Sequence, residues 1–365
     1  MPKATGSYRD VLRVSMPIVV SMTTTVVMTF TDRVFLANYS IDAIAAALPA
    51  GIIAYVFLIF FADAAGYVSV VIAQYTGAGA LQRVGSAMWQ AIYFALLSWL
   101  IMVGLSFGAG PLFRLVGHSA EVQQLEVIYF RVLCLGSGIH IIGMSLSSFF
   151  TGRGVTRPVM IIYIIAMLLN VPLDYALIYG IWIFPEMGIL GAALATVFSW
   201  TTATLMLGLF VFARENDRTF KTRQNRRFDA DLFRRLLRFG VPSSLQFSLD
   251  VLAFSFFVLM VGRIGKAELV VTNIAISLDS VSFRPLSGFA LGASTLVGQA
   301  LGRNRPDEAV AAAKATMVIV AAYITVFILT FVFVPQPLLE LFRPRDISPE
   351  SFAAIKEMGV VVLRF

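Results

Sequence analysis

Hydrophobic residues along this chain fall in long runs that short polar connections separate. Most runs hold 20 or more residues, which is enough for a helix to cross a hydrocarbon layer of about 30 Å. The pattern therefore predicts an all-α polytopic membrane protein. The expected helices cover residues 11–36, 45–75, 87–109, 123–150, 158–181, 188–213, 236–262, 268–301 and 310–334, and a tenth begins near Phe352.

The composition agrees with this pattern. Of the 365 residues, 58% are hydrophobic and 13% are charged, whereas soluble domains have about 25% charged residues. The single cysteine, Cys134, excludes an internal disulfide, and His118 and His140 have no neighbouring metal ligands in the sequence. No nucleotide-binding, hydrolase or zinc-protease motif occurs in the sequence. An enzyme is therefore not expected, and neither is any cofactor apart from a coupling ion.

Basic residues are unequally distributed between alternate connections. The connections on the side of the N-terminus hold 18 of the 28 lysines and arginines. Because basic loops are retained in the cytoplasm, we expect a cytoplasmic N-terminus in a bacterial inner membrane. The net charge of +7 has the same origin, so nucleic acid is not an expected partner.

An internal repeat appears when the chain is shifted by 225 residues against itself. LRVSMP (12–17) then aligns with LRFGVP (237–242), and SVVIAQYTG (69–77) aligns with STLVGQALG (294–302). Six spans separate the copies, so the halves are parallel repeats, as in transporters that bind substrate between two lobes. We expect an N-lobe over 1–213, a basic cytoplasmic linker over 214–236 and an incomplete C-lobe over 237–365. A second half of equal length would end at roughly residue 450, so the chain is expected to be truncated.

Four polar residues of the N-lobe lie at a similar expected depth. With a helical rise of about 1.5 Å per residue, Asp32, Asn170, Asp174 and Thr196 fall in the outer half of their spans. A carboxylate inside a bilayer is costly unless it binds a cation or a proton, so these residues predict a site for coupling Na⁺ or H⁺. One alternative places Asp32 in solvent beside Arg33. Another gives Asn170 and Asp174 a purely structural role between helices.

The C-lobe carries a different set of charges. Asp250 and Asp279 lie inside predicted spans, and Arg284 follows Asp279 by five residues. These three residues are candidates for a C-lobe coupling or substrate site. An ion pair of Arg284 with Asp279 or Asp63 is the structural alternative.

Prolines interrupt several predicted spans. A proline removes one backbone hydrogen bond and permits a bend. The repeat-related Pro17 and Pro242 are therefore hinge candidates, and kinks that only shape packing are the alternative.

Several segments together resemble the MATE (multidrug and toxic compound extrusion) family. They are FTDRVFLAN around Asp32, VIAQYTGAG (71–79), NVPLD (170–174), FPEMGILGAALAT (184–196), VPSSLQFSLD ending at Asp250, and LVGQALG (296–302). The resemblance implies two six-helix lobes, of whose twelve helices nine and the start of a tenth are present here. By motif, Asp32, Asn170, Asp174 and Thr196 match the family's N-lobe cation site. Asp250 matches an acidic position in the seventh helix of the NorM-like branch, where Glu is usual.

The resemblance implies export of amphipathic organic cations in exchange for Na⁺ or H⁺ by rocker-switch alternating access. The expected partners of this monomer are small organic cations and the lipid bilayer. One alternative is a lipid-linked precursor flippase of the same superfamily, which would need a cationic cavity and for which Arg284 is the candidate. Another is that the truncated chain is an inactive fragment.

Overall fold

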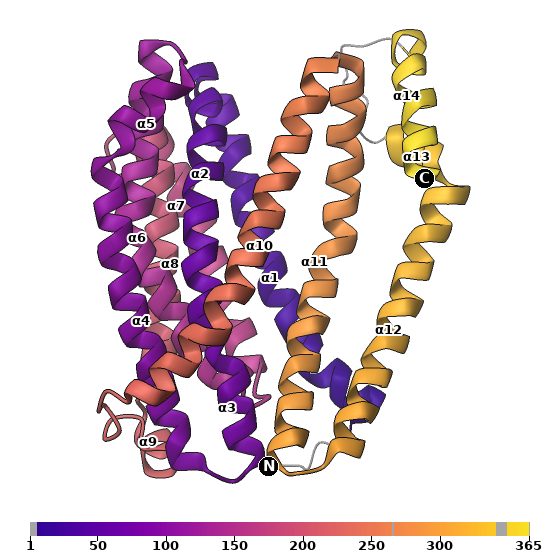
Figure 1. Cartoon of the computed structure of the whole chain (residues 1–365). Helices are drawn as coiled ribbons and strands as arrows, with labels where there is room; N and C mark the ends of the chain where they lie inside the picture. The colour runs from indigo at the N-terminus through magenta and orange to yellow at the C-terminus, as the bar shows by residue number, and fades with distance from the viewer. Residues whose placement is uncertain (1–5, 265, 341–348, 365) are drawn as a thin grey trace.

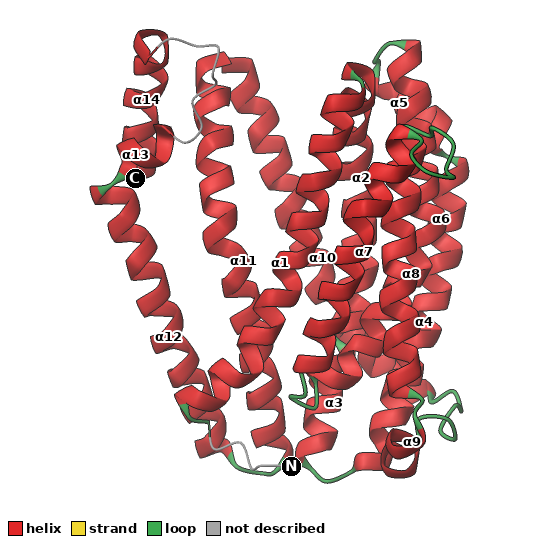
Figure 2. Cartoon of the chain, turned by 180° about the vertical axis from the view of Figure 1, so that it is seen from behind, coloured by secondary structure: helices red, strands yellow, loops and turns green. Residues whose placement is uncertain are grey.

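The structure is a computed structural model that describes residues 6–264, 266–340 and 349–364, and these residues form helices joined by short connections (Figures 1 and 2). Each predicted span has a counterpart, and the short helices α5, α9 and α13 lie between spans. The helices are α1 (Tyr8–Tyr39), α2 (Ile41–Gly66), α3 (Val68–Gly77), α4 (Leu81–Phe107), α5 (Ala109–Val116), α6 (Ala120–Thr151), α7 (Arg157–Tyr179), α8 (Ile189–Val211), α9 (Arg214–Phe220), α10 (Ala230–Ile264), α11 (Lys266–Gly302), α12 (Pro306–Phe333), α13 (Pro335–Glu340) and α14 (Pro349–Arg364).

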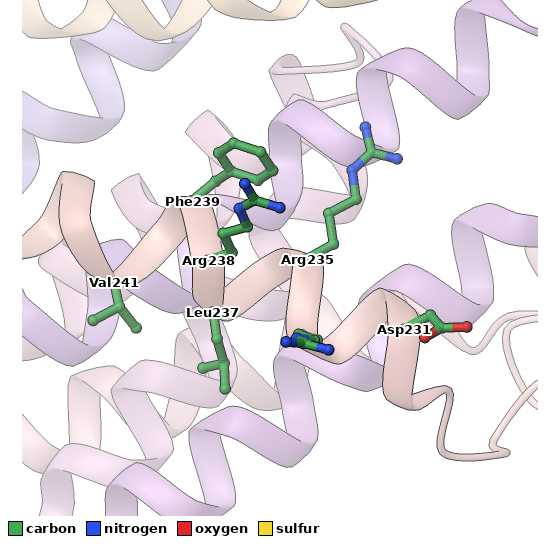
Figure 3. A pocket seen from close by; sticks show the side chains of 7 residues that line it. Asp231, Arg235, Leu237, Arg238, Phe239 and Val241 are labelled. Atoms are coloured by element: carbon green, nitrogen blue, oxygen red, sulfur yellow. The ribbon is translucent and has the colours of Figure 1, made fainter.

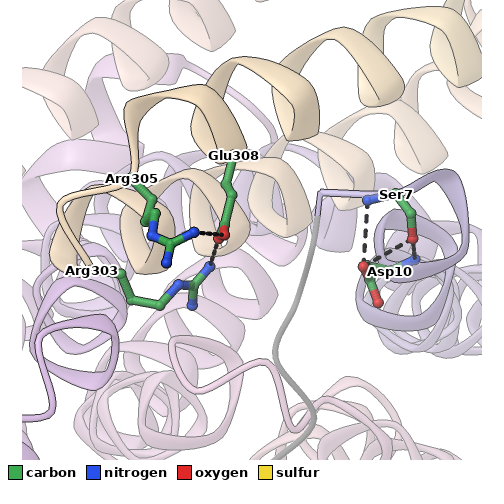
Figure 4. A network of polar contacts seen from close by, with 5 residues as sticks. All are labelled: Ser7, Asp10, Arg303, Arg305 and Glu308. Carbon is green, nitrogen blue, oxygen red and sulfur yellow. Dashed lines mark hydrogen bonds and ion pairs between the residues drawn. The ribbon is translucent and has the colours of Figure 1, made fainter.

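Local signals in the sequence set several helix ends. Ser7 caps α1 through a reciprocal pair of hydrogen bonds with Asp10, in which the Asp10 backbone N–H donates to the Ser7 hydroxyl (Figure 4). Ser40 and Ser119 cap α2 and α6 in the simpler way, with the side-chain oxygen accepting from a backbone N–H. Gly180 ends α7 in a left-handed conformation, which glycine adopts without strain.

Seven helical segments are long and apolar enough to cross a membrane, among the residues that were placed. They are α1, α2 together with α3, α4, α6, α7, α8 and α12. Helices α10 and α11 have 35 and 37 residues and lie over the predicted spans 236–262 and 268–301. The multi-span membrane fold expected from the hydropathy pattern is therefore present.

The helices form two groups that converge at the end of the molecule where α3 ends and α12 begins (Figure 1). We call this the basal end. The first group joins α2, α4, α6, α7 and α8 around a core of alanine, larger aliphatic and aromatic side chains, including Ala65, Met88 and Phe149. The second group contains α11, α12 and α14, of which α11 contacts both others.

Two helices cross from one group to the other. The first half of α1 packs through Val11 and Val14 against Leu296 of α11, whereas Leu36 near its end belongs to the core of the first group. Helix α10 mirrors this arrangement, because Leu232 and Leu236 at its start pack into the first group and its later part contacts α11. These two helices are related by the 225-residue repeat, so the repeat is visible in the packing as well as in the sequence.

The repeat-related segments also meet each other where α3 packs against α11 near the basal end. A Cβ atom at Gly77 would overlap the backbone oxygen of Gln299, and one at Gly302 would overlap that of Gln74. The Gln299 side chain bonds across the groups, where its Nε2 donates to the Gly152 carbonyl at 3.0 Å. Gln74 Oε1 accepts from Arg235 at the start of α10 at 2.8 Å. We call these contacts of Gln74, Gly77, Gln299 and Gly302 the α3–α11 seam. The two Gln-x-x-Gly sequences thus allow a close approach of the α3 and α11 backbones.

A stacked arginine holds the connection between α8 and α10 against the first group. The Arg153 Cζ lies 4.4 Å from the ring centroid of Phe149 and 4.0 Å from that of Phe220 in α9. Its Nη1 donates a long hydrogen bond of 3.5 Å to Asn216. Burial lowers the pKa of Arg153 to about 10, so the guanidinium remains charged at neutral pH.

Replacing Arg153 by Ala should destabilise the folded protein by about 2 kcal/mol, since a desolvated cation over an aromatic face contributes about that much. The measurement is thermal unfolding in detergent, followed by tryptophan fluorescence. Arg157→Ala is the matched control, because Arg157 is exposed. Equal melting temperatures for the two variants would show that the stacking contributes nothing to stability.

Candidate cation site in the first helix group

Two packed helices bring Asp32, Asn170 and Asp174 into the interior of the first group. Asp32 lies on α1, while Asn170 and Asp174 are one turn apart on α7 and share the same face. Their exposed fractions are 6%, 1% and 0%. Asp32 is therefore buried, and the alternative that placed it in solvent beside Arg33 does not hold.

A tyrosine that the sequence reasoning missed completes this cluster. The hydroxyl of Tyr129 on α6 donates to Asp32 Oδ2 at 3.2 Å, and the charges of Asp32 and Asp174 both act on it. Nothing in the spacing along 123–150 distinguishes Tyr129 from other aromatic residues. Tyr129 is identified only by the structure, in which the orientation of α6 about its axis brings the Tyr129 hydroxyl to Asp32.

The cluster contains buried polar atoms that lack hydrogen-bond partners. They are Asp32 Oδ1, both side-chain polar atoms of Asn170 and both carboxylate oxygens of Asp174. Buried polar groups are normally paired, and each unpaired one costs about 1–3 kcal/mol. The two carboxylates also interact electrostatically. Four of these five atoms are oxygens, and such a set suits a hard monovalent cation or a proton, which would lower the cost of the unpaired oxygens.

Thr196 lies beside this cluster rather than within its hydrogen bonds. It is half-buried on α8, and its hydroxyl makes no hydrogen bond to Asp32, Asn170 or Asp174, all of which lie in the described part of the chain. A hydrogen bond links α8 to α7 one turn along α8 from Thr196, where Ser199 Oγ donates to the Ala166 carbonyl at 3.0 Å. The structure thus brings three of the four predicted residues together and adds Tyr129.

The candidate residues of the second group do not form a comparable cluster. Asp250 on α10 and Asp279 and Arg284 on α11 are all exposed. Within the residues that the structure describes, no ion pair joins Arg284 to Asp279 or to the half-buried Asp63 on α2. Arg284 instead lies near the hydroxyl of Tyr55 on α2 and interacts with it electrostatically. Arg284 therefore faces the first group across the space between the groups.

The two hinge candidates differ in their surroundings. Pro17 lies inside α1 and is buried where this helix packs on the second group, and its carbonyl accepts a 2.8 Å hydrogen bond from Ser21. Pro242 lies inside α10 and is exposed.

His118 has a partner that the sequence does not reveal, because its Nδ1 lies 2.7 Å from Oε1 of the buried Glu126. A histidine and one carboxylate do not make a metal site, and no group of three or more potential ligands occurs among the described residues.

Replacing Tyr129 by Phe should shift the cation dependence of coupling without abolishing it. The Tyr129 hydroxyl stabilises the ionised form of Asp32 by about 1.5–3 kcal/mol. Its loss should shift the cation concentration for half-maximal transport roughly tenfold, and toward tighter binding if the cation is H⁺. The measurement is the cation concentration that gives half-maximal transport. Tyr163→Phe is the control, because the Tyr163 hydroxyl donates to the Met144 sulfur and not to Asp32. An unchanged concentration dependence in Tyr129→Phe would remove Tyr129 from the site.

Comparison with known proteins agrees with this architecture. The MatE family model matches residues 17–176 and 242–362, two segments that begin 225 residues apart. Two relatives, each described as a probable multidrug resistance protein NorM, are 27% identical. The Thermotoga maritima protein aligns over 92% of this chain and 72% of its own length, and the Bradyrhizobium diazoefficiens protein over 82% and 64%. The chain thus spans about two thirds of the length of these relatives.

A solved structure described as an outward-facing multidrug resistance MATE family transporter shares the fold. Its TM-score is 0.86 at 21% identity, and the alignment covers all of this chain and 80% of that one. The family model covers well over half of the chain in two matched segments. The chain belongs to the MatE family of membrane transporters.

Proposed function

We propose that the protein is an antiporter that exports amphipathic organic cations in exchange for Na⁺ or H⁺. The observation that carries this proposal is the buried cluster of Asp32, Asn170 and Asp174, with five polar atoms that lack hydrogen-bond partners. A group of this kind is expensive in a membrane protein unless it binds a cation. The NorM relatives, described as multidrug resistance proteins, support the choice of cargo.

Helix α1 provides the route by which cation binding would move the groups. It carries Asp32 in the first group and the residues around Pro17 in the second. A cation between Asp32 and Asp174 would remove their repulsion and draw α1 toward α7, which would shift its other half against α11. Export follows if the cation and the drug bind the two conformations with different affinities. The lobes 1–213 and 237–365 would then rock against each other.

We further propose that the basal end faces the cytoplasm of a bacterial inner membrane. The basic connections lie at this end, and basic residues are retained in the cytoplasm. The α3–α11 seam would then close the cytoplasmic side, and the structure would represent an outward-facing state. A monomer suffices, because both lobes belong to one chain.

The exposed residues of the second group would contact the cargo. Asp250 and Asp279 supply negative charge for an organic cation, and Arg284 opposes it. Because the acids outnumber the arginine, these residues favour a cationic drug over the anionic substrate of a flippase.

The test is transport of ethidium by the 365-residue chain in proteoliposomes, with a Na⁺ gradient and a pH gradient imposed separately. Transport driven by one gradient and dissipated by its ionophore would establish antiport and identify the ion. Absence of transport under both gradients, in protein that is folded by its tryptophan fluorescence, would contradict the proposal for this chain.

A further inference from the structure

A basic cleft lies beside the first turns of α10, near the basal end (Figure 3). Its volume is about 930 Å³. Arginines and apolar side chains line it together: Arg234, Arg235, Arg238, Leu237, Phe239 and Val241. Asp231 is its only acidic lining residue among those described. The cleft therefore offers two more positive than negative charges beside an apolar wall.

The first turns of α10 are amphipathic. Leu232, Leu236 and Gly240, spaced four residues apart, are buried against the first group. The arginines lie on the other side and are exposed, and Phe239 is 48% exposed. This segment is thus held in place on one side and presents charge and apolar surface on the other.

The arginines of the cleft are not neutralised by protein carboxylates. Among the residues that could be placed, none of the three forms an ion pair. Arg235 donates to the amide oxygen of Gln74 at 2.8 Å, and the Arg238 guanidinium lies 5.7 Å from the centroid of the Phe239 ring. Both partners are neutral, so all three positive charges remain available to an anion.

Neighbouring aromatic residues place the cleft at the level of the membrane surface. Trp89 Nε1 donates to the Thr222 carbonyl at 2.7 Å, and the Tyr93 hydroxyl donates to the Arg226 carbonyl. Tryptophan and tyrosine with polar groups satisfied in this way are typical of membrane–water interfaces. On α10 itself, Arg238 is the last charged residue before Asp250. The arginines therefore end where the apolar span begins, which is the depth of lipid phosphates.

We propose that this cleft binds an anionic phospholipid, with its phosphate on the arginines and an acyl chain against Leu237, Phe239 and Val241. Guanidinium groups match phosphate oxygens in charge and geometry. A free phosphate ion would use the arginines alone and leave the apolar wall without a function. The arginines could serve only to keep this segment in the cytoplasm. That role would explain their charge, but it needs no cleft and predicts no preference for an anionic lipid.

The test compares lipid binding by the purified full chain and two triple variants. Each protein is incubated with equal amounts of phosphatidylglycerol and phosphatidylcholine, and bound lipids are counted by native mass spectrometry. The cleft variant is Arg234→Gln/Arg235→Gln/Arg238→Gln. The control variant, Arg9→Gln/Arg13→Gln/Arg83→Gln, removes equal charge from exposed positions outside the cleft. Arg238→Gln alone serves if the cleft variant does not fold.

The unmodified chain should retain phosphatidylglycerol in preference to phosphatidylcholine. The cleft variant should lose at least about tenfold in phosphatidylglycerol affinity, since each basic residue near a membrane surface contributes about 1 kcal/mol. The single variant should lose a few fold, and the control variant should lose little.

Three results would overturn the proposal. In one, the cleft variant or Arg238→Gln binds phosphatidylglycerol as well as the unmodified chain. In another, the control variant loses as much as the cleft variant, which would reduce the effect to overall charge. In the last, millimolar inorganic phosphate displaces the lipid completely, which would identify a site for free anions.

Discussion

Asp174→Asn should reduce cation-driven transport by about 100-fold or more. Asp174 is fully buried, and neither carboxylate oxygen has a hydrogen-bond partner. Asn has the same shape but no negative charge. Removing the Asp174 carboxylate from its buried pair with the bound cation should weaken cation binding by about 3–5 kcal/mol. The measurement is the initial rate of ethidium transport in proteoliposomes under the active gradient. Asp42→Asn is the matched control, since Asp42 is exposed at the start of α2.

The same substitution should not lower thermal stability, which separates a loss of coupling from a loss of folding. An ionised Asp174 would be buried without a hydrogen-bond partner and close to a second carboxylate, so a neutral Asn removes a desolvated charge and its repulsion with Asp32. The melting temperature of Asp174→Asn without added Na⁺ should equal or exceed that of the unmodified chain. A variant that melts normally and still transports at the original rate would remove Asp174 from the coupling site.

Gly77→Ala and Gly302→Ala should each open the α3–α11 seam. In both variants the new Cβ would overlap a backbone oxygen of the facing helix, and backbone cannot move aside as a flexible side chain can. Overpacking of this kind costs about 1–3 kcal/mol. The conformation in which the basal end is closed should therefore lose population about tenfold relative to one in which it is open.

The measurement is the distance between spin labels at Arg83→Cys and Arg305→Cys, in a chain whose one natural cysteine has been replaced by Cys134→Ser. The glycine variants should add a population at longer distance. Gly104→Ala is the control, because a Cβ at Gly104 meets nothing within 4 Å and alanine favours helix. A distance distribution that Gly77→Ala and Gly302→Ala leave unchanged would show that the seam does not hold the basal end closed.

The spans could be predicted from the sequence because the bilayer demands long apolar helices. Breaks within spans and short helices between them could not be predicted in this way. The sequence predicts one helix over residues 45–75, whereas the structure separates α2 from α3 at Tyr67. The sequence does not predict this break because the apolar pattern continues through Val68. Helices α5 and α9, with eight and seven residues, are too short for periodicity to reveal.

The burial of the candidate site could be predicted in part for a related reason. Depth along a helix follows from residue number alone, so Asp32, Asn170 and Asp174 were correctly expected at one level. Rotation about the helix axis depends on tertiary packing. The part played by Tyr129, and the position of Thr196 outside the hydrogen bonds, are therefore visible only in the structure. The crossing of α1 and α10 between the groups is also visible only in the structure, because hydropathy does not determine which helices pack together.

In the proposed mechanism, the cluster of Asp32, Asn170 and Asp174 binds the cation whose gradient drives drug export. The most direct measurement is binding of tetraphenylphosphonium to the purified chain by calorimetry, as a function of Na⁺ concentration and pH, for the unmodified chain and Asp174→Asn. Competition between drug and coupling cation is reciprocal by linkage. Tetraphenylphosphonium should bind more weakly as either the Na⁺ or the H⁺ concentration rises, and this dependence should be lost in Asp174→Asn. Binding that is independent of both ions, or that depends on them equally in the variant, would contradict the proposed mechanism.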